Sequence, residues 1–251
     1  MKFLFLVGTA IKQFLEHEFG AFSEEERFKQ TLKTIETIRE KVPNSYIVVF
    51  ECSYKEIEKQ HKKILKDKCD LFLEFYEDPV LNSLYKNIEK KPNYLIFGKS
   101  LLETRGLLNT LNYIKDRNMF SDSKRIFKMS GRYTLNEDFN IDDYKSSFLD
   151  EKYVVKKYDY QEDDQENPYL ELYQLKGMIV TGLWSFDKSL LKQTIKNLEK
   201  SFSYMEKMIM YTGGVDIEHS LYKFLNHKNI LSISNLGLNV LKGFDGDSYK
   251  L

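Results

Sequence analysis

Residues 3–7 read FLFLV and residues 46–50 read YIVVF, and the segment between them carries the pattern of one amphipathic helix. The first run is continuous and apolar and stops at Gly8, which is typical of a buried strand. Ser23 followed by Glu26 matches a capping box, so the helix is predicted to begin there. A strand–helix–strand crossover places its two strands side by side and parallel. This stretch therefore predicts a parallel sheet and an α/β fold.

Strand and helix patterns alternate along the rest of the chain. The sequence shows no repeat, low-complexity tract or clear linker, which favours one domain over residues 1–251. We expect a Rossmann-like, mixed but mainly parallel sheet flanked by helices, with a nucleotide-binding half over 1–135 and a partly antiparallel half over 136–251. Further strands are predicted at 71–75, 125–129, 152–158, 169–175 and 177–184, and helices at 54–67, at 100–116, from Asp187 to a break at Gly213, and at 216–226.

The charge balance of the chain excludes one broad class of function. The 251 residues contain 38 Lys plus Arg and 38 Asp plus Glu, so the formal net charge is zero. Proteins that bind nucleic acid usually carry a basic excess, because their affinity comes from neutralising phosphates. We therefore expect no nucleic-acid partner.

The basic residues are almost all lysines, which is typical of an AT-rich genome. A position that keeps arginine in such a chain is a candidate for needing the planar, forked guanidinium group. Arg27 and Arg39 lie in the first predicted helix, where a position on the exposed face explains them equally well. The arginines are Arg27, Arg39, Arg105, Arg117, Arg125 and Arg132.

Cysteine content and the N-terminus indicate the compartment. Cys52 and Cys69 have neither metal-ligand spacing nor a disulfide framework, which favours a reducing environment. The apolar start at residues 3–7 is too short for a signal peptide. No stretch approaches the roughly 18 apolar residues of a spanning helix. We expect a cytoplasmic protein with no integral membrane segment.

Several catalytic motifs are absent. Residues 97–100 read FGKS, but the glycine that a P-loop needs five residues earlier is Asn93, and the intervening YLIF reads as a strand rather than a loop. Gly8 stands alone, without the dinucleotide-binding fingerprint. Neither the zinc motif HExxH nor the GxSxG elbow of hydrolases occurs. These absences disfavour P-loop, Rossmann-type oxidoreductase, metalloprotease and hydrolase functions.

Two segments combine residue types that can act on an anionic ligand. Residues 128–133 read KMSGRY at the end of a predicted strand, and they are equally consistent with a turn that places an arginine on the surface. Lysine point charges and arginine forks suit phosphates. Residues 216–219 read DIEH at a helix start, where acids favour the helix dipole without any function. They could also supply a carboxylate base or a Glu–His pair for a metal.

A third segment lies in the glycine-rich tail. Asp245-Gly246-Asp247 matches the Asp-x-Asp pattern with which many sugar transferases bind a metal and a diphosphate. A polar turn explains it more simply.

The predicted sheet itself indicates where a ligand would bind. In a parallel sheet, ligands bind at the carboxyl ends of the strands, which here are residues 8–10 and 51–53.

Together, these segments resemble those of small glycosyltransferase-like proteins of bacteria, phages and large viruses, which have a GT-A-type nucleotide-sugar fold. The similarity spans most of the chain, and SGRY is its most specific part. The matching stretches are GTAI at 8–11, ERFKQTLKTIETIR at 26–39, PNSYIVVFE at 43–51, LLNTLNYI at 107–114, IFKMSGRY at 126–133 and DIEHSLYKFL at 216–225.

This resemblance implies that a sugar is moved from a nucleotide diphosphate to a glycan or lipopolysaccharide-like acceptor, with the acceptor and catalytic half at 136–251. Arg132 and Glu218 would be catalytic: the first stabilises the leaving group, and the second is the base for an acceptor hydroxyl if the reaction inverts. His219 could be a late metal ligand. The donor-binding residues would be Gly8, Thr9 and Glu51 at the base and ribose, Lys128 at the diphosphate, and Arg105, Ser130, Gly131 and Tyr133 nearby.

The chain departs from the family at one point. Many GT-A enzymes place Asp-x-Asp after the middle strand, where this chain has Ser130-Gly131-Arg132-Tyr133. Either cationic side chains replace a Mn or Mg ion, or Asp245 and Asp247 fold back to bind it. The departure also motivates an alternative, a non-catalytic binding or assembly protein on a degenerate nucleotide-sugar fold. A metal-dependent nuclease is a more distant alternative that the zero net charge disfavours.

Overall fold

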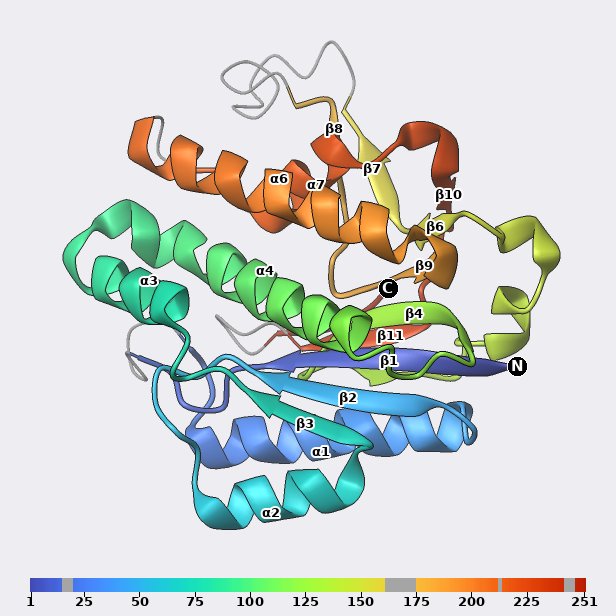
Figure 1. The fold of residues 1–251 in the computed structure, drawn as a ribbon, viewed down its shortest axis with the longest axis horizontal. Coiled ribbons are helices and arrows are strands. Elements are labelled where there is room, and N and C mark those ends of the chain that lie inside the picture. Colours follow the sequence, from blue (N-terminus) through green and yellow to red (C-terminus); the bar gives the residue numbers. More distant parts are fainter. Residues whose placement is uncertain (15–19, 161–174, 212–213, 242–246) are drawn as a thin grey trace.

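A mixed sheet of seven strands forms the centre of the protein (Figure 1). The computed structural model describes residues 1–14, 20–160, 175–211, 214–241 and 247–251. The strands lie in the order β10 (Ile230–Ser232), β6 (Tyr153–Val155), β9 (Leu183–Asp187), β4 (Ser123–Ser130), β1 (Lys2–Thr9), β2 (Tyr46–Glu51) and β3 (Leu71–Glu74).

Strand β1 lies between β4 and β2 and is parallel to both, and β3 continues the parallel part beside β2. Strand β9 is antiparallel to β4 and β6, and β10 pairs parallel with β6. The prediction of a mainly parallel sheet with an antiparallel part in the second half is confirmed. Two small sheets accompany it: β5 (Thr134–Leu135) with β11 (Leu238–Leu241) and β12 (Ser248–Lys250), and β7 (Lys157–Asp159) with β8 (Gly177–Ile179).

Helices cover both faces of the central sheet (Figure 1). Helices α1 and α2 lie against one face of the sheet, and α3, α4 and α6 lie over the other face. None of the helices among the described residues is long and apolar enough to cross a membrane. The helices are α1 (Glu24–Lys41), α2 (Lys59–Lys68), α3 (Pro79–Lys90), α4 (Pro92–Asp116), α6 (Leu191–Tyr211) and α7 (Ile217–Phe224), with short 3-10 turns at Ile141–Tyr144, Ser147–Leu149, Lys188–Leu190 and His227–Asn229.

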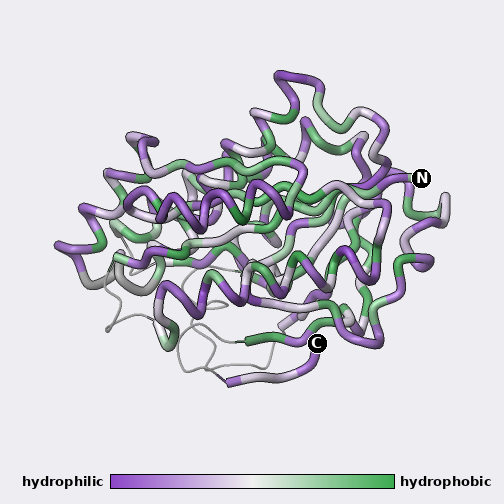
Figure 2. The backbone as a smooth tube through the Cα atoms, turned by 90° about the horizontal axis from the view of Figure 1, so that it is seen from below, coloured by the Kyte–Doolittle hydropathy of each residue, from purple (hydrophilic) through white to green (hydrophobic). Residues whose placement is uncertain are grey.

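The side chains of β1 alternate between two hydrophobic cores. Phe3, Phe5 and Val7 pack in the core on the α1 side, whereas Leu4 and Leu6 pack in the core that includes residues of α4 and α6. Because both faces of the strand are buried, its sequence is continuously apolar rather than alternating. In Figure 2, hydrophobic residues gather toward the centre of the molecule, and the helices alternate between hydrophobic and hydrophilic residues along the chain.

The predicted capping box is present. The Ser23 side chain accepts a hydrogen bond from the Glu26 backbone N–H, and the Glu26 carboxylate accepts one from the Ser23 backbone N–H at 2.8 Å. The predicted helix over 54–67 begins later, at Lys59. Asp187 caps the helical segment that continues as α6, as predicted. Of the strand predicted over 169–175, residues 169–174 lie outside the described residues.

One predicted strand is wrong. Residues 94–97, which read YLIF, belong to helix α4, and α3 precedes it where no helix was predicted. Asp78 caps α3 by accepting hydrogen bonds from the Val80 and Leu81 backbone N–H groups, both at 2.9 Å. Proline occupies the first turn of both helices, a position for which its fixed φ is suited. The apolar run at 94–97 is therefore part of a long helix rather than a strand.

Helix α4 approaches β2 very closely at Gly106. A Cβ atom at this position would overlap the Sγ atom of Cys52 and would lie 3.2 Å from the Phe50 ring. Glycine weakens a helix interior by about 1 kcal/mol relative to alanine, so close packing is the reason for glycine here. Since Phe50 and Cys52 lie beneath the candidate site described below, this contact sets the position of α4 over that site.

We predict that Gly106→Ala destabilises the protein by about 1–3 kcal/mol, because overpacking outweighs the gain in helix propensity. Urea denaturation of the variant measures the change. Cys52→Ala removes the Sγ atom that the new methyl group would meet, so the loss caused by Gly106→Ala should shrink in that background. An equal loss in both backgrounds, or a stabilised single variant, would contradict this explanation of α4 packing.

Candidate functional site

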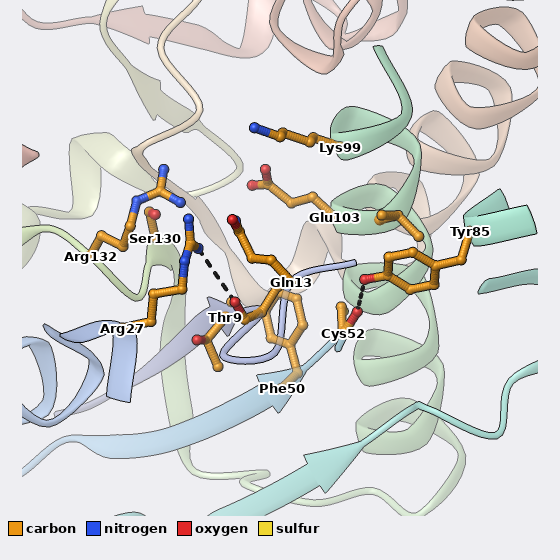
Figure 3. Close-up of a pocket in the computed structure, with 13 residues that line it drawn as sticks. Thr9, Gln13, Arg27, Phe50, Cys52, Tyr85, Lys99, Glu103, Ser130 and Arg132 are labelled. Atoms are coloured by element: carbon orange, nitrogen blue, oxygen red, sulfur yellow. Dashed lines mark hydrogen bonds between the residues drawn. The ribbon is translucent and has the colours of Figure 1, made fainter. Parts of the chain in front are cut away.

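A pocket lies where β1, β2 and β4 end, at their carboxyl termini (Figure 3). It encloses about 700 Å³, part of it open to solvent. Parallel strands that share one edge bring their terminal loops together, which is where such sheets bind ligands. The lining residues are Gly8, Thr9, Ala10, Gln13, Arg27, Phe50, Cys52, Tyr85, Lys99, Leu102, Glu103, Ser130 and Arg132.

Two predicted glycines allow the strand exits to approach each other. The Gly131 backbone N–H donates a hydrogen bond to the Gly8 carbonyl at 2.8 Å. A Cβ at Gly131 would lie 3.0 Å from that carbonyl oxygen, and a Cβ at Gly8 would lie 2.6 Å from the Phe50 ring. Glycine at both positions therefore keeps the exits of β1 and β4 in contact beneath the pocket.

Three cationic side chains line the pocket from three different elements. Arg27 of α1 is buried, with 3% of its surface exposed, and donates from Nη1 to the Ala10 carbonyl at 3.4 Å. Arg132 follows β4, and its buried Nε has no hydrogen-bond partner among the described residues. Lys99 extends from α4 toward both arginines (Figure 3). Positive charge therefore converges on the pocket although the chain as a whole is neutral.

The pKa of Lys99 reports these surroundings. Partial desolvation, followed by the positive charges of Arg27 and Arg132, lowers this pKa from 10.5 to about 8, although the residue as a whole remains accessible to solvent. The arginine charges therefore act directly on the lysine ammonium group.

Lys128, predicted to face a diphosphate, is not among the residues lining the pocket. It is almost fully buried, with 1% of its surface exposed. Its ammonium group is paired with the Glu103 carboxylate and donates to the Thr181 carbonyl at 2.8 Å. Because Glu103 does line the pocket, Lys128 compensates the negative charge that this carboxylate would otherwise bring to it.

Glu218 is joined to the same network through Thr181. The Thr181 backbone N–H and hydroxyl both donate to Glu218 Oε1 at 3.4 Å. Burial, and to a lesser extent the negative charge of Asp216, raises the pKa of Glu218 from 4.5 to about 7. Thr181 contacts both Lys128 and Glu218, so this carboxyl group lies just beyond the cationic pocket and can bind or release a proton near neutral pH.

His219 is held by hydrogen bonds on both sides of its ring. Nδ1 lies 2.6 Å from Asp216 Oδ1, and Nε2 lies 2.5 Å from the Tyr160 hydroxyl. Both ring nitrogens are therefore engaged, which leaves neither directed at a metal in this arrangement. Asp247 is an exposed residue just before β12, and Asp245 lies outside the described residues.

The described residues do not fit a divalent metal ion at the pocket. The exit of β4 supplies Ser130 and Arg132 in place of carboxylates, and Glu103 is paired with Lys128. Within the described ranges, no three His, Cys, Asp or Glu side chains cluster as metal ligands would. Magnesium and manganese prefer oxygen ligands such as carboxylates, so the side chains described at this pocket suit an anion better than a divalent cation.

Of the remaining predicted donor residues, Thr9 and Ser130 line the pocket and three others do not. Glu51 is buried under the loop after β1, where its carboxylate accepts hydrogen bonds from the backbone N–H groups of Ile11 and Ser53. Arg105 forms an ion pair with Asp78 at 2.8 Å. Tyr133 packs against Gly182, and its carbonyl accepts a hydrogen bond from Thr34.

Sequence reasoning missed two of the pocket cations. Arg27 was expected on the exposed face of the first helix, but it is buried and lines the pocket. Lys99 belongs to the FGKS segment that was set aside as an incomplete P-loop. The scarcity of arginine could have singled out Arg27, whereas nothing local to Lys99 indicates that α4 brings it over the sheet edge.

Comparisons with known proteins identify the fold. No family model matches the chain, and no curated protein matches it in sequence. Among solved structures, the galactosyltransferase LgtC in complex with donor and acceptor sugar analogues superposes with a TM-score of 0.53 at 10% identity, over 92% of this chain and 73% of that chain. The sequence prediction of a GT-A-like fold is thereby confirmed.

Two fungal structures give similar results. Core-mannan synthase A (CmsA/Ktr4) from Aspergillus fumigatus, in its Mn/GDP form, superposes with a TM-score of 0.55 at 9% identity, over 98% of this chain and 76% of that chain. The mannosyltransferase Ktr4p from S. cerevisiae in complex with GDP gives 0.53 at 10% identity, over 91% and 68%. At these identities the likeness concerns the fold.

We predict that Glu51 makes stability depend on pH. Burial outweighs its hydrogen bonds and raises its pKa from 4.5 to about 7. A raised folded-state pKa gives a contribution that is present below pH 4.5 and is lost as pH rises through 7. In Glu51→Gln, the unfolding free energy relative to wild type should therefore rise over this interval, by up to about 3 kcal/mol.

Chemical denaturation at a series of pH values measures this difference. The exposed Glu199 on α6 provides the control, and Glu199→Gln should run parallel to wild type at every pH. Parallel curves for Glu51→Gln as well would mean that this carboxyl group has an ordinary pKa in the folded protein.

Proposed function

We propose that the protein is a glycosyltransferase that moves a sugar from a nucleotide diphosphate donor to a hydroxyl group of a glycan or lipopolysaccharide-like acceptor. The observation that carries the proposal is the cationic pocket at the strand ends of a GT-A-like fold, formed by Arg27, Lys99 and Arg132 around Gly8 and Thr9. Such a pocket suits a ligand whose centre is a diphosphate. The solved structures with this fold include complexes with GDP and with donor and acceptor sugar analogues.

The two halves of the chain would have different roles, one in binding the donor and one in binding the acceptor and in catalysis. The pocket cations all come from residues 1–135, which we propose as the donor-binding half. Glu218 comes from residues 136–251, which we propose as the acceptor and catalytic half. The two cysteines are free thiols, in agreement with action in a reducing compartment such as the cytoplasm.

The chemistry needs a proton acceptor and a stabilised leaving group. The acceptor hydroxyl oxygen bonds to the anomeric carbon of the sugar while the bond from that carbon to the diphosphate oxygen breaks. Where the reaction inverts, Glu218 takes the proton of the hydroxyl, and its pKa of about 7 suits a base that operates near neutral pH. The electron pair of the broken bond leaves with the nucleoside diphosphate, whose charge the pocket cations offset.

The alternative is a non-catalytic binding or assembly protein on the same fold. The cationic exit of β4, which replaces the Asp-x-Asp of many GT-A enzymes, favours it. Such a protein would bind nucleotide sugars in the pocket without turnover, so Glu218 would have no kinetic role. A panel of nucleotide sugars tested by thermal shift and by product formation separates the two functions.

We predict that Glu218→Gln lowers kcat by about 100-fold to 10,000-fold, the usual range for loss of a general base, with little change in donor binding. The wild-type rate should rise as pH increases through 7, because Glu218 must be deprotonated to act. Steady-state kinetics across pH on the best donor of the panel provides the measurement.

Glu199→Gln serves as the matched control and should retain wild-type kinetics. Wild-type kcat in Glu218→Gln, or a pH profile unchanged by the substitution, would remove Glu218 from the reaction. Donor binding without turnover by the wild type would favour the non-catalytic alternative.

A further inference from the structure

We propose that Arg27, Lys99 and Arg132 form a cationic cradle that binds the diphosphate of the donor and stabilises it as a leaving group in place of a divalent metal ion. The cradle rests on the proposed function for the identity of its ligand. Its members come from α1, α4 and the exit of β4, and all three line one pocket. Lys128, which the resemblance placed at the diphosphate, is not one of them.

The three side chains face a common space. Figure 3 shows Arg27 and Arg132 on one side of the pocket and Lys99 extending toward them from α4. Desolvation, and after it the charges of both arginines, lower the pKa of Lys99, so each arginine lies within electrostatic reach of the lysine. Like charges gathered in this way repel, and an anion bound between them relieves that repulsion.

The carboxylate in the same pocket does not cancel this charge. Glu103 is paired with Lys128, whose ammonium group is buried beneath it and is also held by the Thr181 carbonyl. This pair contributes no net charge. The charge of the Glu103 carboxylate is therefore already compensated by Lys128, and the same pocket is lined by the cationic side chains of Arg27, Lys99 and Arg132.

The two arginines of the cradle are held in place by the fold. Arg27 is anchored by its hydrogen bonds to the carbonyls of Ala10 and Phe22, at 3.4 and 3.3 Å. Arg132 directly follows Gly131, whose N–H is bonded to the β1 exit at Gly8. Its Nε is buried without a hydrogen-bond partner among the described residues, so it retains a donor for a ligand.

The charge of the cradle suits the leaving group better than the intact donor. The diphosphate of a nucleotide sugar carries about two negative charges, and about one more develops on the terminal phosphate as the sugar departs, because a phosphate monoester ionises again near pH 6. Three cationic side chains therefore stabilise the developing charge more than the starting charge, which is the condition for accelerating the reaction.

A divalent ion is poorly accommodated at this position. It would add positive charge to a pocket that already holds three cations, and the described residues offer it no cluster of carboxylate or imidazole ligands. The fold is shared with the Mn/GDP form of core-mannan synthase A. The proposed difference is that side chains of this chain do what a metal ion does in an enzyme with a metal-bound diphosphate.

Calorimetric titration of the full chain with inorganic pyrophosphate, UDP and GDP tests the cradle, in EDTA and again with manganese. We expect pyrophosphate and at least one nucleotide to bind in EDTA, with an affinity that manganese changes less than threefold. Lys99→Gln and Arg132→Gln should each weaken binding about 10-fold to 100-fold, the usual loss for a charge-assisted hydrogen bond. Arg132→Lys, which keeps the charge but removes the fork, should weaken it by less.

Lys196→Gln, at an exposed position on α6, is the matched control and should bind as the wild type does. Because Arg27 is buried, its variant is Arg27→Lys, which keeps the positive charge and removes the guanidinium fork. Thermal unfolding checks that this variant folds before it is titrated.

The pH dependence of binding provides an independent readout. Because Lys99 must be protonated to hold an anion, affinity should fall as pH rises above 8. Lys99→Gln should lose this dependence.

Among the described residues, the charged side chains that line the pocket with Lys99 include Arg27, Arg132 and Glu103. The cradle is overturned if binding requires manganese, or if the cradle variants bind pyrophosphate as tightly as the wild type. Loss of manganese-dependent binding in Asp245→Asn or Asp247→Asn would assign the metal to the tail and also overturn it. These outcomes leave the proposed function intact. Binding of pyrophosphate but of no nucleotide would support the cradle and contradict the proposed function.

Discussion

The position of β1 between two parallel neighbours is the constraint on which the rest of the structure depends. Its backbone pairs with β2 from Leu4 to Thr9 and with β4 from Phe3 to Gly8. Three strand exits therefore meet at one edge of the sheet, and the hydrogen bond from Gly131 to Gly8 joins two of them. Helices α1 and α4, packed on opposite faces, bring Arg27 and Lys99 to that edge. The pocket is thus a consequence of strand order, with its chemistry supplied by side chains far apart in the sequence.

Arginine usage separates structural from site positions in this lysine-rich chain. Arg125 is buried and donates to the carbonyls of Leu149 and Lys152. Arg39 donates to Asp70 and to the Ser45 carbonyl, and Arg105 holds Asp78 at the start of α3. These three use the fork to tie backbone and carboxylate groups together. Arg27 and Arg132 instead line the pocket with their charged groups. The scarcity of arginine therefore marks positions that need the guanidinium group, but scarcity alone does not separate structural positions from positions in the site.

The first half of the sheet could be predicted because its signals are local. The apolar run of β1 and the capping box at Ser23 depend on neighbouring residues alone, and both are present. The failure at residues 94–97 has a physical cause: a short apolar run has the same composition in a strand and on the buried face of a helix. The pair Asp78-Pro79 was the available signal for a helix start in that region.

The site could be predicted only in part, because its residues meet through packing. Gly8, Thr9 and Ser130 lie at the ends of strands, and Arg132 comes just after one. The rule that ligands bind at strand ends identifies them. Lys128 lies on β4, as Ser130 does, but its side chain is buried and paired with Glu103. No local sequence pattern reveals this pairing.

A crystal structure with UDP or GDP bound would show where the donor lies. We expect the diphosphate above Gly8 and Thr9, with its oxygen atoms in contact with Arg27, Lys99 and Arg132. A nucleotide bound away from this pocket, or one whose diphosphate points away from these three side chains, would contradict this expectation.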